Sequence, residues 1–269
     1  FEGEDVQGGD LGANYKRAKL AWYTVDNSVF YTSIGNRRPS NLKEDDLENH
    51  YERIVYPQEI HQQQDRTMIT TNETILDIAY FPSERGPYNY NPNLDADGLL
   101  PNPEGNWGGI TNHINNEVDF DKTNIEFIEF WMMDPFIGFA DGNPKGKVLD
   151  GRFNEHNKTG GSLIFNLGSV SEDYMKDGRH AFENGLPADG DLTNASATEW
   201  GYITEEQFLT NQFENSQGSR ANQDVGLDGL RNDLEAAYFQ PYIDQLNVAG
   251  LAREEILADP SGDNFQYYL

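Results

Sequence analysis

An oxygen-rich run near the C-terminal end of the chain has almost the spacing of a calcium-binding loop. Calcium takes six or more oxygen ligands from a loop that turns sharply, with a glycine at position 6 and a glutamate at position 12. If Asp224 is position 1, Gly229 stands at position 6, whereas Gly226 at position 3 has no side-chain oxygen. We predict a structural calcium site of reduced affinity; the alternative is an acidic, glycine-rich turn that binds no ion. The predicted ligands are Asp224, Asp228, Leu230 through its carbonyl, Asn232 and Glu235.

A second run, Asn93-Leu-Asp-Ala-Asp-Gly98, has a similar beginning. Asn93, Asp95 and Asp97 fall at positions 1, 3 and 5, and glycine falls at position 6. Position 12 is Glu104, but the prolines at 101 and 103 disfavour the usual helical exit from such a loop. We therefore keep a second calcium site as a hypothesis beside a hydrogen-bonded Asx turn.

The chain offers no arrangement of residues for catalysis, so we predict that it is not an enzyme. Glu126 and Glu129 are three residues apart on an expected strand, so they point to opposite faces and do not converge on one glycosidic bond. Neither a nucleophile elbow, a phosphate loop nor a dinucleotide fingerprint is present. The histidines are scattered and form no metal motif: His50, His61, His113, His156 and His180.

Composition excludes several classes of partner. The chain has 19 Lys and Arg residues against 46 Asp and Glu residues, a net charge of −27, which disfavours nucleic acids and anionic membrane surfaces. Without cysteine it has neither disulfides nor thiolate metal sites. No stretch approaches about 18 consecutive apolar residues, and alternating lipid-facing segments are not sustained, so we expect a water-soluble chain that does not span a membrane.

The pattern of apolar residues predicts a mainly β fold. The strongest expected strand covers 124–134; it is apolar on both faces from Phe127 onward, which is typical of a central strand covered on both sides. Further strands are expected over 19–25, within 67–81 and over 162–167, with a long loop over 82–110. The second half is more helical, with helices expected from Ser171, from Thr204, over 235–239 and before Asp259-Pro260.

Together these elements predict a jelly-roll-like β-sandwich decorated by short helices and long loops, with more helix in the C-terminal half. We expect residues 1–12 to be frayed and residues 13–269 to form a single composite domain, with a soft boundary near 110 or 170.

Several long and unusual strings occur along the chain in a fixed order. They are Tyr80-Phe-Pro-Ser-Glu-Arg-Gly-Pro-Tyr-Asn-Tyr-Asn-Pro-Asn93, Asn124-Ile-Glu-Phe-Ile-Glu-Phe-Trp-Met-Met-Asp-Pro-Phe136, Phe165-Asn-Leu-Gly-Ser-Val-Ser-Glu-Asp173, Lys176-Asp-Gly-Arg179, Glu183-Asn-Gly-Leu-Pro187 and Gln223-Asp-Val-Gly-Leu-Asp-Gly-Leu230.

In content and order these strings resemble the SprA/Sov family of Bacteroidetes, from about Lys16 to the C-terminus. Members are very large outer-membrane proteins that serve as the translocon of the type IX secretion system and are needed for gliding motility. The resemblance implies that the chain is a soluble fragment of such a protein, in the periplasm, in the lumen of the barrel or at the cell surface. It implies protein transport as the role, with secreted cargo and accessory translocon subunits as partners.

A carbohydrate-binding β-sandwich module of a secreted protein is the alternative from a different class. It is motivated by the calcium candidates and by the aromatic residues of the long loop, Tyr88, Tyr90 and Trp107, which could stack on sugar rings. The same residues could instead fasten the loop to the sheet.

Overall fold

The computed structural model describes residues 9–23, 54–61, 72–111, 119–120, 122–133, 161–168, 186–197, 202–204 and 213–264. The chain divides into two compact units. Unit 1 comprises Phe1–Leu20, Tyr80–Ile110 and Ile164–Tyr267, and unit 2 comprises Ala21–Ala79, Thr111–Leu163 and Tyr268–Leu269. Two of the divisions, after residues 110 and 163, lie near the soft boundaries that the sequence suggests, although one composite domain is the preferred prediction.

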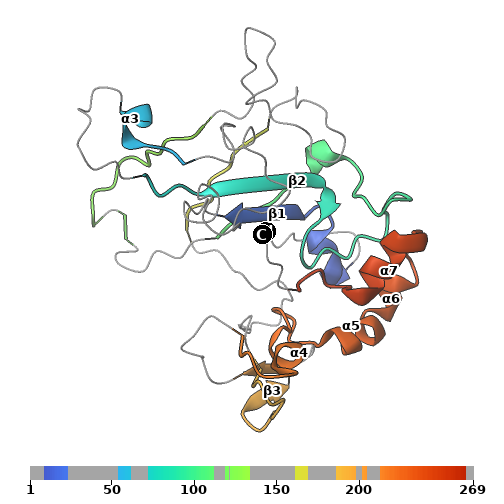
Figure 1. Ribbon diagram of the computed structural model, residues 1–269. Coiled ribbons are helices and arrows are strands. Elements are labelled where there is room, and N and C mark those ends of the chain that lie inside the picture. The colour runs from blue at the N-terminus through green and yellow to red at the C-terminus, as the bar shows by residue number, and fades with distance from the viewer. Residues whose placement is uncertain are drawn as a thin grey trace, which may run out of the picture. The chain divides into compact units, whose positions relative to one another are not determined.

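The regular elements are short, and Figure 1 labels most of them. Within the described residues they are, in chain order, η1 (Gly9–Asn14), β1 (Ala18–Tyr23), α3 (Pro57–Ile60), β2 (Asp77–Arg85), η2 (Pro103–Gly105), β3 (Ala195–Ala197), β4 (Tyr202–Thr204), α4 (Ser219–Gln223), α5 (Asn232–Tyr238), α6 (Gln240–Ile243) and α7 (Gly250–Ala258).

The strands pair in twos. β1 pairs with β2, and β3 pairs antiparallel with β4 in a register that places Ser196 opposite Ile203. A parallel bridge also joins Arg17, just before β1, to Trp107. The described parts of the chain therefore contain two two-stranded sheets and no β-sandwich, so the jelly-roll-like sandwich stays a prediction.

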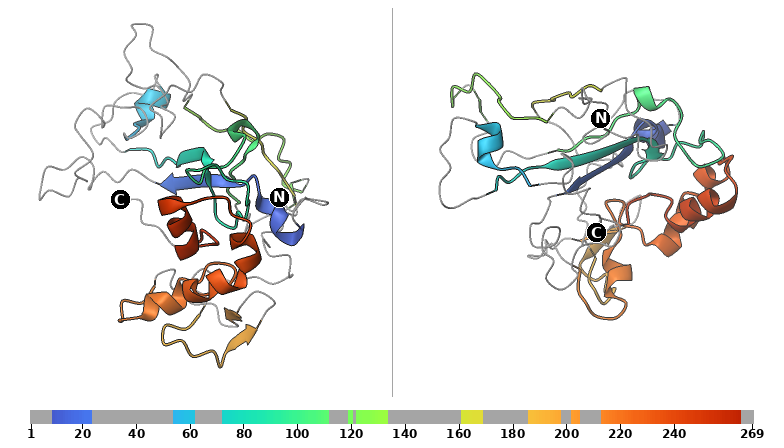
Figure 2. Two further views of the ribbon diagram at one scale, coloured as in Figure 1. Left: turned by 90° about the vertical axis from the view of Figure 1, so that its right-hand side faces the viewer. Right: turned by 45° about the horizontal axis from the view of Figure 1, so that its top comes forward.

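Four short helices, α4 to α7, follow one another in the C-terminal part of unit 1, and Figure 2 shows them in orange and red. Pro241 does not simply stop the predicted helix over 235–239. It falls in the first turn of α6, where the missing N–H of proline costs no helical hydrogen bond, so α5 ends and α6 begins with little interruption. The last helix, α7, ends at Ala258 with Asp259 as its C-cap, where the sequence predicts a stop.

The core of unit 1 is built from the long loop after β2 and from these helices. Tyr90 stacks on Phe239 with ring centroids 4.5 Å apart, and Tyr242 meets Tyr90 edge-on at 5.6 Å. Burial of a large apolar side chain contributes about 1.5–3 kcal/mol, so the aromatic contacts hold a loop that has no regular structure of its own. The buried apolar cluster is Ala18, Tyr88, Tyr90, Leu94, Leu100, Leu230, Phe239, Tyr242, Ile243, Leu246, Val248 and Ile256.

The two strongest strand predictions are wrong for the residues that the structure describes. Residues 124–133 and 162–167 have no regular secondary structure, and their side chains are exposed rather than covered. A strand exists only where a neighbouring strand accepts and donates its backbone hydrogen bonds. The apolar pattern of one segment shows that its side chains favour burial, but it does not show which segment pairs with it.

The described residues test three other expectations only in part. Residues 9–12, expected to be frayed, belong to η1, whereas residues 1–8 lie outside the described residues. The helices expected from Ser171 and from Thr204 also fall mainly outside them. Among the described residues, no helix has the length and apolarity needed to cross a membrane.

Candidate functional site

The loop between α4 and α5, residues 224–231, turns through two glycines with positive φ. Gly226 has φ +56° and Gly229 has φ +68°, a region that only glycine enters at little cost. A Cβ at position 226 would lie 1.9 Å from Oδ2 of Asp263, and a Cβ at position 229 would lie 2.0 Å from the carbonyl oxygen of Tyr202. Each glycine therefore allows a sharp turn and also leaves space for a distant part of the chain.

Three carboxylates meet beneath this loop. Asp228 comes from the loop, Glu235 from the first turn of α5, and Asp263 from the loop that follows α7. Each offers a carboxylate oxygen, and these oxygens lie within 4.8 Å of one another. All three residues are buried, with exposed fractions of 2% for Asp228, 0% for Glu235 and 8% for Asp263. We call this group the acidic triad.

Ser261 connects two members of the acidic triad. Its hydroxyl donates to Oδ2 of Asp228 at 2.7 Å, and its backbone N–H donates to Oε2 of Glu235 at 3.0 Å. The backbone N–H of Leu230 donates to the other oxygen of Asp228 at 2.8 Å. The hydroxyl of Tyr90 is hydrogen-bonded to the Ser261 hydroxyl at 2.9 Å. The triad is thus attached to the aromatic core of unit 1.

The loop that carries Ser261 and Asp263, residues 259–264, is held in shape by Asp259 and by Arg85. Oδ1 of Asp259 accepts the backbone N–H groups of Gly262, at 2.8 Å, and of Asp263, at 3.2 Å. The Arg85 guanidinium donates to the carbonyl of Asp259 at 2.9 Å and to that of Pro260. Because Arg85 stands at the end of β2, this contact fixes the 259–264 loop to the sheet.

Burial perturbs the acid–base behaviour of the triad. Removal from water, together with the nearby Glu235 charge, raises the pKa of Asp228 to about 7, against the opposing hydrogen bond from Leu230. Burial likewise raises the pKa of Glu235 to about 7, with the hydrogen bond from Ser261 opposing the shift and the charge of Asp259 adding to it. Their ionised forms are therefore disfavoured unless positive charge is supplied.

This arrangement suits the binding of a hard cation better than catalysis. Carboxylates with raised pKa values in an open cleft are candidates for acid–base chemistry. The triad is instead buried, so a substrate of ordinary size has no direct access to it. Carboxylate and hydroxyl oxygens are the ligands of Ca²⁺ and Mg²⁺.

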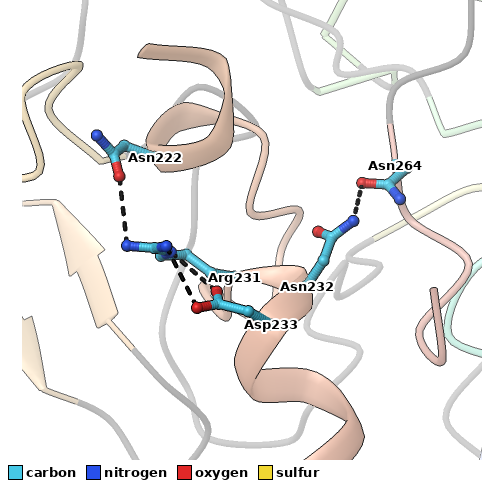
Figure 3. A network of polar contacts seen from close by, with 5 residues as sticks. All are labelled: Asn222, Arg231, Asn232, Asp233 and Asn264. Carbon is cyan, nitrogen blue, oxygen red and sulfur yellow. Dashed lines mark hydrogen bonds and ion pairs between the residues drawn. The ribbon is translucent and has the colours of Figure 1, made fainter. Parts of the chain in front are cut away.

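The structure brings together only part of the ligand set predicted for residues 224–235. Asp228 and Glu235 converge, but Asp224 forms an ion pair with Arg220 at 3.0 Å. The Asn232 side chain turns to the 259–264 loop, where its amide donates to Oδ1 of Asn264 at 2.9 Å (Figure 3). Leu230 contributes its N–H to Asp228 and its side chain to the core.

Figure 3 also shows the polar contacts at the start of α5. The Arg231 guanidinium holds both carboxylate oxygens of Asp233, at 3.0 and 3.3 Å, and reaches Oδ1 of Asn222 at 3.5 Å. Arg231 and Asp233 are exposed, so these contacts orient the helix and contribute little to stability.

The second predicted calcium run forms a turn closed by its own backbone. Oδ1 of Asp95 accepts the N–H groups of Asp97, at 2.9 Å, and of Leu99, at 2.8 Å, which is the geometry of an Asx turn. Asn93, Asp95 and Asp97 are all exposed. Asn93 donates its N–H to Oδ1 of Asn91. The three residues therefore do not form a buried oxygen cluster.

Sequence reasoning missed Asp263 and Ser261. A signal for them exists in Asp259-Pro-Ser-Gly-Asp-Asn264, which is a second oxygen-rich turn with a glycine, directly after a helix. Taken alone, such a turn is common, and only the fold places it against Asp228 and Glu235. Glu129 lies on the segment expected to be covered on both sides, but it is exposed.

Comparisons with known proteins do not assign the chain to a family. No family model matches it, and no curated protein matches it.

Proposed function

We propose that the chain is a soluble, non-enzymatic module of a SprA-like outer-membrane translocon of the type IX secretion system. It docks secreted cargo or accessory subunits and thereby shapes or gates the passage. The observation that carries this proposal is the exposed apolar stretch over residues 125–133, which we call segment 125–133. The resemblance of the long sequence strings to the SprA/Sov family supplies the context in which such a surface has a partner.

Segment 125–133, in unit 2, presents large apolar side chains to solvent. The exposed fractions are 76% for Phe127 and 73% for Trp131, and Trp131 has an edge-on ring contact with His61 at 5.6 Å. Contiguous exposed apolar surface of this kind marks sites of contact with other proteins, because leaving it in water is unfavourable. The exposed apolar residues are Ile125, Phe127, Ile128, Phe130, Trp131, Met132 and Met133.

The rest of the chain agrees with a binding role. Among the described residues, the group of acids with the most perturbed pKa values is enclosed in the core, where it has no route to a substrate. The net charge of −27 keeps the remaining surface hydrated and discourages adhesion to polyanions. An acidic surface that carries a defined apolar stretch such as segment 125–133 favours a specific protein contact over nonspecific adsorption.

The proposal is tested in the full-length parent protein by making segment 125–133 polar. The double substitution Phe127→Ser and Trp131→Ser is compared with Leu251→Ser on α7, because Phe127 and Leu251 are equally exposed, at 76% each. We expect the double variant to reduce cargo secretion and the co-purification of accessory subunits several-fold, and the Leu251 variant to leave both unchanged. Normal secretion and normal co-purification by the double variant, at wild-type abundance, would refute the proposal.

Most of the aromatic residues that motivate the carbohydrate-binding alternative are buried in this fold. Tyr88 and Tyr90 are 3% and 2% exposed and belong to the core cluster, so they are unavailable for stacking on sugar rings. Trp107 is only partly buried, but its backbone is hydrogen-bonded to Lys16 and Ala18 beside β1. The packing role of these aromatic residues therefore agrees better with the structure than sugar recognition does.

A further inference from the structure

The acidic triad of unit 1 combines side chains from the loop between α4 and α5, from α5 itself and from the 259–264 loop. Asp228 and Glu235 occupy positions 5 and 12 of the calcium-like run, and Asp263 comes from the 259–264 loop. Position 3 of that run is Gly226, which offers no side-chain oxygen. The Asp263 carboxylate lies directly over Gly226, at the place where a side chain at position 226 would begin. Asp263 thus supplies from elsewhere the carboxylate that the run itself lacks.

Glu235 gives the second, independent indication of a ligand. The residue is fully buried, and its Oε2 is held by the N–H of Ser261. Its other oxygen, Oε1, is buried as well and receives no hydrogen bond from any residue that the structure describes. A buried carboxylate oxygen without a donor is unfavourable by about 1–3 kcal/mol or more, and this cost disappears if a cation binds there.

The charges around the acidic triad also favour binding of a cation. Arg85 is the basic residue whose charge acts on Glu235, but its guanidinium donates to the backbone carbonyls of Asn89, Asp259 and Pro260. The guanidinium that acts on Glu235 is therefore already engaged by backbone oxygens. A divalent ion supplies the remaining positive charge at the centre of the cluster.

The spacing of the oxygens allows one calcium ion to contact all three. Two ligand oxygens of one calcium ion, each at about 2.3–2.6 Å, are at most about 5 Å apart. The triad oxygens lie within 4.8 Å of one another. Calcium also tolerates irregular coordination, whereas magnesium requires a near-octahedral set.

We infer that Asp228, Glu235 and Asp263 together bind one divalent cation of the calcium class, and that this ion fastens the 259–264 loop to the loop between α4 and α5. The ligand set differs from the linear loop that the sequence predicts, because Asp263 replaces Asp224 and Asn232. The ion has a structural role and stabilises the C-terminal half of unit 1.

The test uses the purified chain after treatment with a chelator, in buffer with about 0.15 M NaCl so that diffuse binding to the acidic surface is screened. Calcium chloride is titrated in a calorimeter, and thermal unfolding is followed with calcium, with magnesium and with neither. We expect one saturable calcium site and a rise in melting temperature that is larger with calcium than with magnesium.

Two variants remove ligands and one serves as the matched control. Glu235→Gln and Asp263→Asn should each weaken calcium binding by at least about tenfold and abolish the rise in melting temperature. Asp233→Asn removes an exposed carboxylate from the same helix and should bind within about twofold of the wild type. Glu235→Gln removes a buried charge, so this variant should stay folded without calcium, as its circular dichroism spectrum would show.

Three results would overturn the inference. The first is a flat titration of the folded wild-type chain at millimolar calcium. The second is calcium binding that survives in Glu235→Gln. The third is equal loss of binding in the Asp233→Asn control, which would identify diffuse attraction to the acidic surface. If Asp263→Asn does not fold, the wild-type titration and the Glu235 variant still decide the matter.

Discussion

Replacement of Gly229 by alanine should destabilise unit 1 for two reasons that can be separated. Its φ of +68° is unfavourable for any residue with a Cβ, which costs about 1–2 kcal/mol. The new Cβ would also lie 2.0 Å from the carbonyl oxygen of Tyr202, whereas ordinary contacts begin at 3.4 Å. Because the obstructing atom belongs to the backbone of β4, rotation of a side chain cannot relieve the clash.

The magnitude follows from these two contributions. To relieve the clash, β4 or the loop must shift, and overpacking of this kind costs about 1–3 kcal/mol. The shift also breaks the hydrogen bond from the Tyr202 N–H to the Gly229 carbonyl. Alanine also reduces the conformational entropy of the unfolded chain, which stabilises the folded state by about 0.4–1 kcal/mol and offsets part of this loss. We therefore expect Gly229→Ala to lower the free energy of unfolding by about 2–4 kcal/mol.

Gly250→Ala is the matched control. Gly250 has almost the same φ, +67°, but a Cβ there would meet nothing within 4 Å. The control should cost no more than about 1.5 kcal/mol, because only the backbone conformation is penalised. Urea denaturation followed by circular dichroism gives both values, and the two slopes should agree. Equal losses for the two variants would show that contact between Gly229 and β4 is not what constrains this turn.

Two further predictions concern the interior of unit 1. In metal-free buffer the free energy of unfolding should fall as pH rises from about 4 to about 7. The reason is that Asp228 and Glu235 keep their protons in the folded state after the unfolded chain has released them. Below this pH window the two carboxyls are protonated in both the folded and the unfolded state, and above it they are ionised in both. Raising the pKa of Glu235 from 4.5 to about 7 corresponds to about 3 kcal/mol, and urea denaturation at pH 5 and pH 8 that gave equal stabilities would contradict this. Arg85→Met should lower the free energy of unfolding by at least about 2 kcal/mol, because it leaves backbone carbonyls of the 259–264 loop without a donor. In the same denaturation assay, Arg231→Met at an exposed position should change the free energy of unfolding by no more than about 0.5 kcal/mol.

The sequence predicts those parts of the candidate site that depend on local spacing. Asp228 and Glu235 are related by a loop and one helical turn, so the calcium-like pattern identifies both. Asp263 depends on how α7 packs against the core, and no local pattern contains that information. Asp263 is a ligand that the pattern omits, whereas Asp224 is one that it includes wrongly. The Asp224 carboxylate forms an ion pair with the nearby Arg220 instead of joining the triad.

The same distinction explains the fold. The end of α7 at Asp259 follows from proline and capping chemistry within a few residues, and the sequence predicts it correctly. The strand predicted over 124–134 rests on apolar side chains alone, and within it residues 124–133 are exposed without regular structure. Apolar composition indicates what a segment prefers to contact, but the partner comes from elsewhere in the chain or from another protein.

The hydrogen bonds of the 259–264 loop have a consequence for the order in which unit 1 is completed. Tyr90 and Ser261, which are 171 residues apart, are joined directly, and the carbonyl of Ser261 also accepts the N–H of Tyr88. Contacts this distant must overcome the entropy of closing a long loop, so they form late and slowly. During synthesis from the N-terminus, Tyr88 and Tyr90 therefore form these hydrogen bonds only after Ser261 has been added, and a chain interrupted before Ser261 would lack them.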